Sequence, residues 1–125
     1  MQIGRMIILI VEDNAHMRHL LIEIVRPAFA RSTVLVAADA SSATRLCRET
    51  RPELVLMDVA LPDGNGIALT AEIKSLFPKS KVVIVSNHRS RAFQDAAVTA
   101  GAAAYLFKDE ILDKLLPALA LVLEQ

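Results

Sequence analysis

The sequence predicts an α/β protein: a doubly wound, five-stranded parallel sheet with helices on both faces. Five short apolar runs recur along the 125 residues, and segments with helical spacing alternate with them. The runs lack the polar alternation of a half-exposed strand, which indicates strands buried on both faces. Right-handed crossovers between parallel strands then place helices on both sides of one sheet.

The clearest strand is Leu54-Val55-Leu56-Met57, which is bounded by Pro52-Glu53 and ends at Asp58. The remaining strands are expected over 6–11, 33–37, 81–85 and 102–107. Polar residues follow four of the five, at the sheet edge where ligands bind in open α/β folds.

In the first helix, apolar residues recur at helical spacing after Asn14, a plausible N-cap, and Pro27 is expected to kink or end it. The second helix carries Cys47 on its apolar face, which predicts a small buried residue there.

Gly64-Asn65-Gly66 precedes the third helix and is expected to supply flexible backbone. That helix should stop at Pro78, and the Ala-rich fourth helix at Gly101. Asp109 is expected to cap the last helix.

Composition restricts the functional classes. Residues 1–125 suffice for one domain, with no output domain expected in this chain. Fourteen basic residues balance fourteen acidic ones, so no global field attracts nucleic acid or membrane. With Cys47 as the one cysteine, no membrane span and no cleavage site after the early Arg5, a cytoplasmic location is predicted.

Five polar residues should converge at one edge of the sheet: Glu12, Asp13, Asp58, Ser86 and Lys108. Two carboxylates ~4 Å apart repel by about 4 kcal/mol at an effective dielectric of 20, so either a proton or a cation must relieve them. Oxygen ligands favour Mg²⁺. A carboxylate beside Mg²⁺, a hydroxyl and an ammonium suggests phosphoryl transfer to Asp58.

From Met6 to about Leu123, the chain resembles the receiver domain of bacterial two-component response regulators. The matching residues are Glu12-Asp13, Asp58 within Leu56-Met57-Asp58-Val59-Ala60-Leu61-Pro62-Asp63-Gly64, Ser86, and Lys108 within Tyr105-Leu106-Phe107-Lys108. The resemblance implies a flavodoxin-like fold with strand order 2-1-3-4-5. It also implies a signalling phosphoacceptor, not an enzyme, that assists its own phosphorylation and dephosphorylation.

The resemblance assigns further roles. A sensor histidine kinase or a histidine phosphotransfer protein would phosphorylate Asp58. Asp13, Asp58 and the backbone carbonyl of Ala60 would hold Mg²⁺ (or Mn²⁺), with Glu12 acting directly or through water. Ser86 and Lys108 would contact the phosphoryl group.

Ser86 and Tyr105 would also form a switch pair, since in the family the hydroxyl moves and the ring turns inward. That change repacks the surface of the fourth helix, fifth strand and fifth helix. A homodimer through this surface, or through the first and fifth helices, is an open alternative to a monomer.

Several residues depart from the family pattern or tune it. Asn87 stands where Ala or Gly is usual and could narrow access to the phosphoryl group. Ala60 and His88 occupy positions that tune dephosphorylation, and Asp109 replaces a frequent Pro.

Two other functions remain open at this point. An aspartyl phosphatase would need Asp-x-Asp where the chain has Glu12-Asp13-Asn14, and a substrate pocket that 125 residues hardly accommodate. A phosphorylation-independent interaction module on the same fold has some support from Asn87, but Asp58 and Lys108 argue against it.

Overall fold

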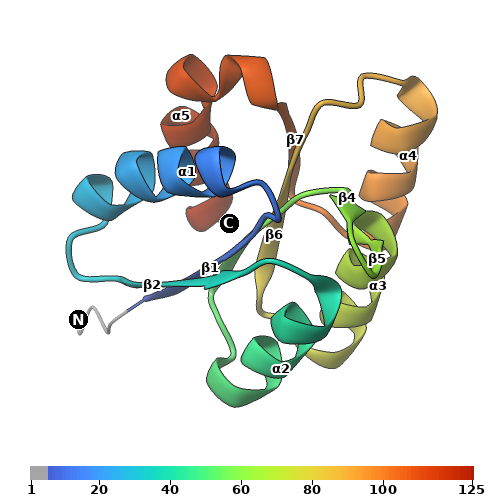
Figure 1. The fold of residues 1–125 in the computed structure, drawn as a ribbon, viewed down its shortest axis with the longest axis horizontal. Coiled ribbons are helices and arrows are strands. Elements are labelled where there is room, and N and C mark those ends of the chain that lie inside the picture. Colours follow the sequence, from blue (N-terminus) through green and yellow to red (C-terminus); the bar gives the residue numbers. More distant parts are fainter. Residues whose placement is uncertain (1–5) are drawn as a thin grey trace.

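The computed structural model describes residues 6–125 as a single parallel sheet between two layers of helices (Figure 1). The strand order is β2-β1-β3-β6-β7, which confirms the expected 2-1-3-4-5 topology. The five strands are β1 (Ile7–Val11), β2 (Thr33–Ala37), β3 (Leu54–Met57), β6 (Lys81–Ser86) and β7 (Ala104–Phe107).

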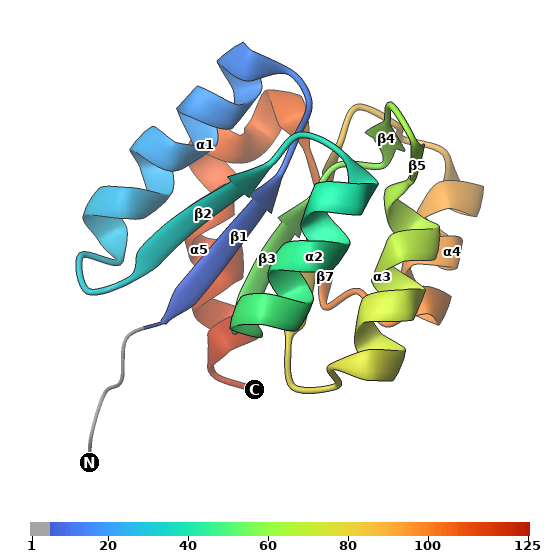
Figure 2. The ribbon, with the colours of Figure 1, turned by 60° about the horizontal axis from the view of Figure 1, so that its bottom comes forward.

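The helices divide between the two faces of the sheet, as Figures 1 and 2 show. One face carries α1 (Ala15–Ala28) and α5 (Ile111–Leu123). The other carries α2 (Ala40–Thr50), α3 (Gly66–Leu76) and α4 (Arg91–Ala100). A single 3-10 turn, η1 (Lys108–Glu110), joins β7 to α5.

Successive residues of each central strand point to opposite faces, so the sheet separates two cores. Ile8 and Ile10 of β1 pack with Leu21 of α1 and Leu115 of α5. Their neighbours Leu9 and Val11 pack instead with the side chains of α2 and α3. All of these residues are almost completely buried, as uninterrupted apolar runs predict for central parallel strands.

Local signals set most helix boundaries as expected. The side chain of Asn14 accepts a hydrogen bond from the Met17 backbone N–H and caps α1, and Pro27 lies in the last turn of that helix. Gly101 ends α4 with φ of 101°, in the left-handed region that favours glycine. Cys47 is buried within α2, as predicted.

The glycine-rich segment before α3 is ordered. Ala60–Leu61 (β4) and Gly64–Asn65 (β5) form a two-stranded antiparallel hairpin that the sequence did not reveal. Asn65 also caps α3, and its side chain accepts from the N–H groups of Ile67 and Ala68. Gly64 and Gly66 both have negative φ; among the glycines of residues 6–125, Gly101 alone has a positive value.

The prediction that Asp109 caps the last helix is wrong. Asp109 lies inside η1, and α5 begins after Glu110 without a side-chain cap. The Asp109 carboxylate instead accepts hydrogen bonds from the guanidinium of Arg89, a residue of the loop between β6 and α4.

All five strands of the main sheet run in the same direction, so their carboxyl ends form one edge. The carboxyl end of the chain, after α5, lies at the opposite end of the molecule (Figure 2). Between residues 6 and 125, no helix is long and apolar enough to cross a membrane.

Candidate functional site

Three carboxylates meet at the carboxyl edge of the sheet. Glu12 and Asp13 follow β1, and Asp58 follows β3; one oxygen of each lies within 4.8 Å of the others. The parallel pairing fixes this meeting: the Glu12 N–H donates to the Ala37 carbonyl and the Asp58 N–H to the Val11 carbonyl. Glu12 and Asp58 are buried, at 1% and 6% exposure, while Asp13 is exposed.

The side chain of Lys108 brings a positive charge to two of these carboxylates. Its Nζ atom lies 2.9 Å from Glu12 Oε1 and 3.3 Å from Asp58 Oδ2. Lys108 immediately follows β7, at the far side of the sheet from β1. One ammonium therefore contacts two of the three carboxylates, and it neutralises only part of their negative charge.

Burial and neighbouring charges both shift the protonation equilibria of this cluster. Burial raises the pKa of the Glu12 carboxyl; the contact with Lys108 opposes this rise, and the nearby Asp58 carboxylate adds to it. For Lys108, burial is the largest influence and acts to lower the pKa. The Glu12 contact and the charge of Asp58 together outweigh burial, so the pKa of Lys108 lies above its ordinary value.

A cavity of about 490 Å³ opens over these groups. Its lining includes backbone and side chains from four loops at the same edge. The lining residues are Glu12, Asp13, Asn14, Ala15, Asp58, Ala60, Asn87, His88 and Lys108.

The donor set fits a small hard cation. It offers carboxylate oxygens from three residues, and oxygen ligands are those that Mg²⁺ and Mn²⁺ prefer. Glu12 Oε1 is buried, and its partner is Lys108 Nζ at 2.9 Å. Because the one ammonium is shared between Glu12 and Asp58, the three carboxylates favour a further cation.

Ser86 lies beside this cavity but not in its wall. The side chain is fully buried at the end of β6, and its Oγ accepts a hydrogen bond of 3.0 Å from the His88 N–H. The next residues, Asn87 and His88, line the cavity instead. Tyr105 also contacts this loop, because its hydroxyl donates to the His88 carbonyl at 2.7 Å.

The sequence did not predict the contacts that three residues near the site make. Asp63, in the β4–β5 turn, accepts from the backbone N–H groups of Ala40 (2.7 Å) and Ser41 (3.0 Å) at the start of α2. Gly66 approaches the Asp58 backbone closely. Arg89 pairs with Asp109. The Pro-Asp-Gly sequence at 62–64 was the one local signal, and it indicated a turn but not its partner.

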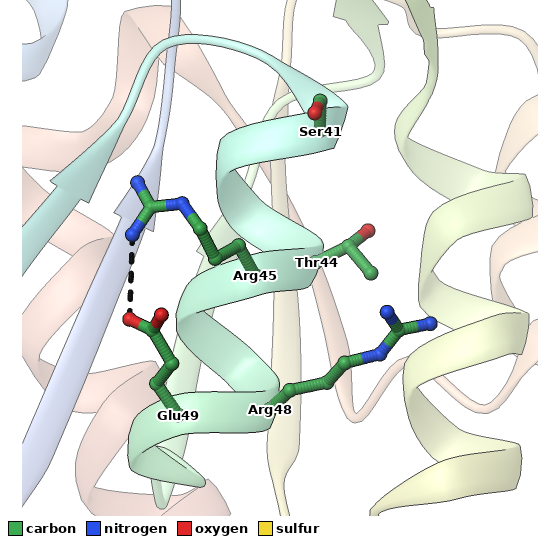
Figure 3. Close-up of a pocket in the computed structure, with 5 residues that line it drawn as sticks. All are labelled: Ser41, Thr44, Arg45, Arg48 and Glu49. Carbon is green, nitrogen blue, oxygen red and sulfur yellow. Dashed lines mark hydrogen bonds and ion pairs between the residues drawn. The ribbon is translucent and has the colours of Figure 1, made fainter.

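A second hollow, of about 540 Å³, lies along the outside of α2 (Figure 3). It is lined by Ser41, Thr44, Arg45, Arg48 and Glu49. Arg45 pairs with Glu49 on the same helix at 3.3 Å, and both side chains are more than half exposed. None of the sequence-predicted site residues lines this hollow, so it is separate from the acidic cavity.

This fold, with its acidic cavity and its strand-end lysine, defines a class of protein. The family model of the response regulator receiver domain matches residues 8–120, which is most of the chain. The chain therefore belongs to this family, as the sequence resemblance predicted, and is a receiver domain of two-component signalling.

Individual relatives agree with this membership. The chemotaxis protein CheY of Thermotoga maritima is 32% identical over 101 residues, an alignment covering 81% of this chain and 83% of CheY. The chain spans only 38% and 29% of the length of two further curated relatives.

Solved structures agree as well. A two-component response regulator of the LuxR family from Aurantimonas superposes with a TM-score of 0.88 at 31% identity, covering 97% of this chain and 86% of that one. The Mn²⁺-bound response regulator Rcp1 superposes with a TM-score of 0.78 at 23% identity, covering 94% and 88%; this second likeness shows the fold alone.

Proposed function

We propose that this receiver accepts a phosphoryl group on Asp58 from a phosphohistidine of a sensor histidine kinase or a histidine phosphotransfer protein. One observation carries the proposal: Asp58 lies buried at a strand end, with Lys108 Nζ 3.3 Å from its Oδ2 and two further carboxylates within 4.8 Å. Membership of the receiver family supports the same role.

In the proposed transfer, a carboxylate oxygen of Asp58 attacks phosphorus and forms a new O–P bond. The P–N bond of the donor breaks, and the imidazole nitrogen keeps its electron pair. The protein needs to position the groups and neutralise charge, and Lys108 is placed to pair with a phosphoryl oxygen. The product is an acyl phosphate on Asp58, so the domain is a phosphoacceptor that assists its own phosphorylation and dephosphorylation.

Asp13, Asp58 and the Ala60 backbone carbonyl are the proposed ligands of Mg²⁺ or Mn²⁺, with Glu12 acting directly or through water. The cluster of three carboxylates supports this assignment, as does the Mn²⁺ held by Rcp1. A bound divalent cation would neutralise oxygens of the incoming phosphoryl group.

Ser86 and Tyr105 are the proposed switch pair. Ser86 is buried beside Asn87 and His88, which line the cavity, and its hydroxyl would contact a phosphoryl oxygen as the loop that follows β6 shifts. Such a shift would release the Tyr105–His88 hydrogen bond and repack the surface formed by α4, β7 and α5. Ala60, Asn87 and His88 would tune access and phosphate lifetime.

The exposed apolar residues of α5 suit a protein partner. Leu112 is 77% exposed and Leu121 66%, both on the surface of that helix. We also propose a homodimer, either through α4, β7 and α5 or through α1 and α5. A cytoplasmic location and the absence of direct nucleic-acid contact are two further proposals. Sedimentation velocity with Leu112→Lys tests the dimer.

Incubation with acetyl phosphate and Mg²⁺, followed by intact-mass measurement, tests the phosphoacceptor role. We expect a gain of one phosphoryl group that hydroxylamine removes, that needs Mg²⁺, and that is absent in Asp58→Asn. An acid-stable label on Ser86 would contradict the assignment.

A phosphorylation-independent interaction module is the second candidate, because Asn87 and His88 line the cavity in front of Asp58 and Lys108. If neither the wild-type protein nor Asn87→Ala gains a phosphoryl group, this candidate replaces the first.

A further inference from the structure

We propose that Arg89 is a positioning residue that latches the loop of residues 87–90 beside the acidic cavity and so slows phosphorylation of Asp58. The inference rests on the proposed phosphoacceptor function. It adds to that function a specific restraint, formed by Arg89, Phe107 and Asp109, on the movement that brings Ser86 toward the phosphoryl group.

Three elements hold Arg89. Its guanidinium carbon lies 4.2 Å from the centroid of the Phe107 ring in β7, a cation–π contact. Its Nη2 atom lies 2.5 Å and 2.6 Å from the two carboxylate oxygens of Asp109 in η1. Its backbone carbonyl accepts from Gln94 Nε2 of α4 at 3.0 Å. The guanidinium is thus fixed both to a ring and to a carboxylate.

The residue before Arg89 is held in a similar way. The His88 ring packs on Phe93 of α4 with 4.6 Å between centroids. The His88 carbonyl accepts from the Tyr105 hydroxyl, and its N–H donates to Ser86 Oγ. The loop is therefore tied to β6, β7 and α4 at consecutive residues.

The position of Ser86 explains why a restraint on this loop would affect phosphorylation. Ser86 is fully buried and outside the cavity wall, whereas Asn87 and His88 form part of that wall. In the proposed switch, the hydroxyl contacts a phosphoryl oxygen when this loop moves. If the contacts of Arg89 with Phe107 and Asp109 exist only before the loop moves, they favour the unphosphorylated arrangement. Removing them then shifts the population toward the arrangement in which the loop has moved.

The exposure of the Arg89 and Asp109 side chains distinguishes a restraint on the loop from a contribution to the stability of the whole domain. The Arg89 and Asp109 side chains are 52% and 69% exposed, and exposed ion pairs add little to global stability. Arg89 lies in the loop after β6, and Asp109 lies 20 residues further along the chain in η1. The effect of their contact should therefore fall on the loop and on the reaction, and hardly on the unfolding of the whole domain.

The test compares phosphorylation rates with acetyl phosphate and Mg²⁺, followed by intact mass, in the wild type, Arg89→Ala and Asp109→Asn. We expect Arg89→Ala to react about three- to tenfold faster, the factor expected for losing a cation–π contact and an exposed ion pair. Asp109→Asn, which keeps the ring contact, should show a smaller acceleration. Arg91→Ala removes an exposed arginine from the start of α4 and is the matched control.

Thermal unfolding of each variant is the second readout. The proposal expects faster labelling of Arg89→Ala with a midpoint lowered by no more than a few degrees, the shift that corresponds to losing one exposed ion pair and one cation–π contact. Labelling at the rate of Arg91→Ala, or slower, overturns the latch, and so does an acceleration accompanied by a much larger fall in the midpoint. A wild-type protein that gains no phosphoryl group contradicts the proposed function as well, which distinguishes the two failures.

Discussion

The α-carbon of Gly66 packs directly against the backbone carbonyl of Asp58. A β-carbon at residue 66 would lie 1.9 Å from that oxygen, far inside van der Waals contact. The Gly66 N–H also donates to the Val59 carbonyl at 2.7 Å, so the start of α3 is fastened to the segment that carries Asp58. The glycine is required here by close packing and not by a left-handed backbone.

Gly66→Ala should therefore destabilise the protein by about 1–3 kcal/mol, the usual cost of forcing an extra methyl group into a packed site. Urea unfolding measures the change. Gly64→Ala is the control, because its β-carbon would meet only Ala40 Cβ, at 3.3 Å. Equal losses in the two variants would contradict the close-packing explanation.

Mg²⁺ should raise the thermal unfolding midpoint. A cation at ten times its dissociation constant stabilises the folded state by about 1.4 kcal/mol if it does not bind the unfolded chain. Asp13→Asn, which removes one of the three carboxylates, should lose most of this shift. Asp95→Asn on the exposed side of α4 should keep it. A full Mg²⁺ shift in Asp13→Asn would argue against Asp13 as a ligand.

Asp63 should stabilise the start of α2 from outside that helix. Its carboxylate accepts from two N–H groups, those of Ala40 and Ser41, that have no partner within the helix. Asp63→Ala should cost about 1 kcal/mol. Amide hydrogen exchange should accelerate at Ala40 and Ser41 before it does elsewhere in α2. Unchanged exchange at these two amides would exclude the capping role.

Cys47 should respond to pH in a defined direction. Burial raises the pKa of its thiol from 9.0 to about 11, so between these values the unfolded chain has lost a proton that the folded protein keeps. Stability from this thiol is complete below pH 9 and falls as pH rises toward 11, by up to about 2–3 kcal/mol.

Urea unfolding of the wild type and Cys47→Ala at pH 8 and pH 10.5 tests this direction, since the difference between the two proteins should shrink at the higher pH. Iodoacetamide should also label Cys47 slowly in native protein and rapidly in urea. Fast native labelling would show that the thiol is accessible.

The sheet and most of the site were predictable because local patterns indicate the strands, and the parallel fold then determines which strand ends meet. Uninterrupted apolar runs indicate strands buried on both faces, and a parallel arrangement brings the residues after each run to one edge. Glu12, Asp58 and Lys108 meet for that reason. The cap at Asn14 and the stop at Gly101 likewise depend on neighbouring residues only.

The remaining features depend on contacts between distant segments. Asp109 pairs with Arg89, 20 residues away, and Asp63 reaches amides 22 and 23 residues away. Ser86 follows its strand as expected, yet the path of the next two residues keeps it out of the cavity wall. No spacing in the sequence specifies such a path, because loop conformation follows from packing against β7 and α4.

The carboxyl end of the chain lies opposite the edge formed by the carboxyl ends of the strands (Figure 2), and the acidic cavity opens at that edge. A protein tethered to a sensor chip through Gln125 would therefore present Asp58 and the surrounding loops to the solution. Immobilisation in this orientation leaves the acidic cavity accessible to a molecule that approaches from solution.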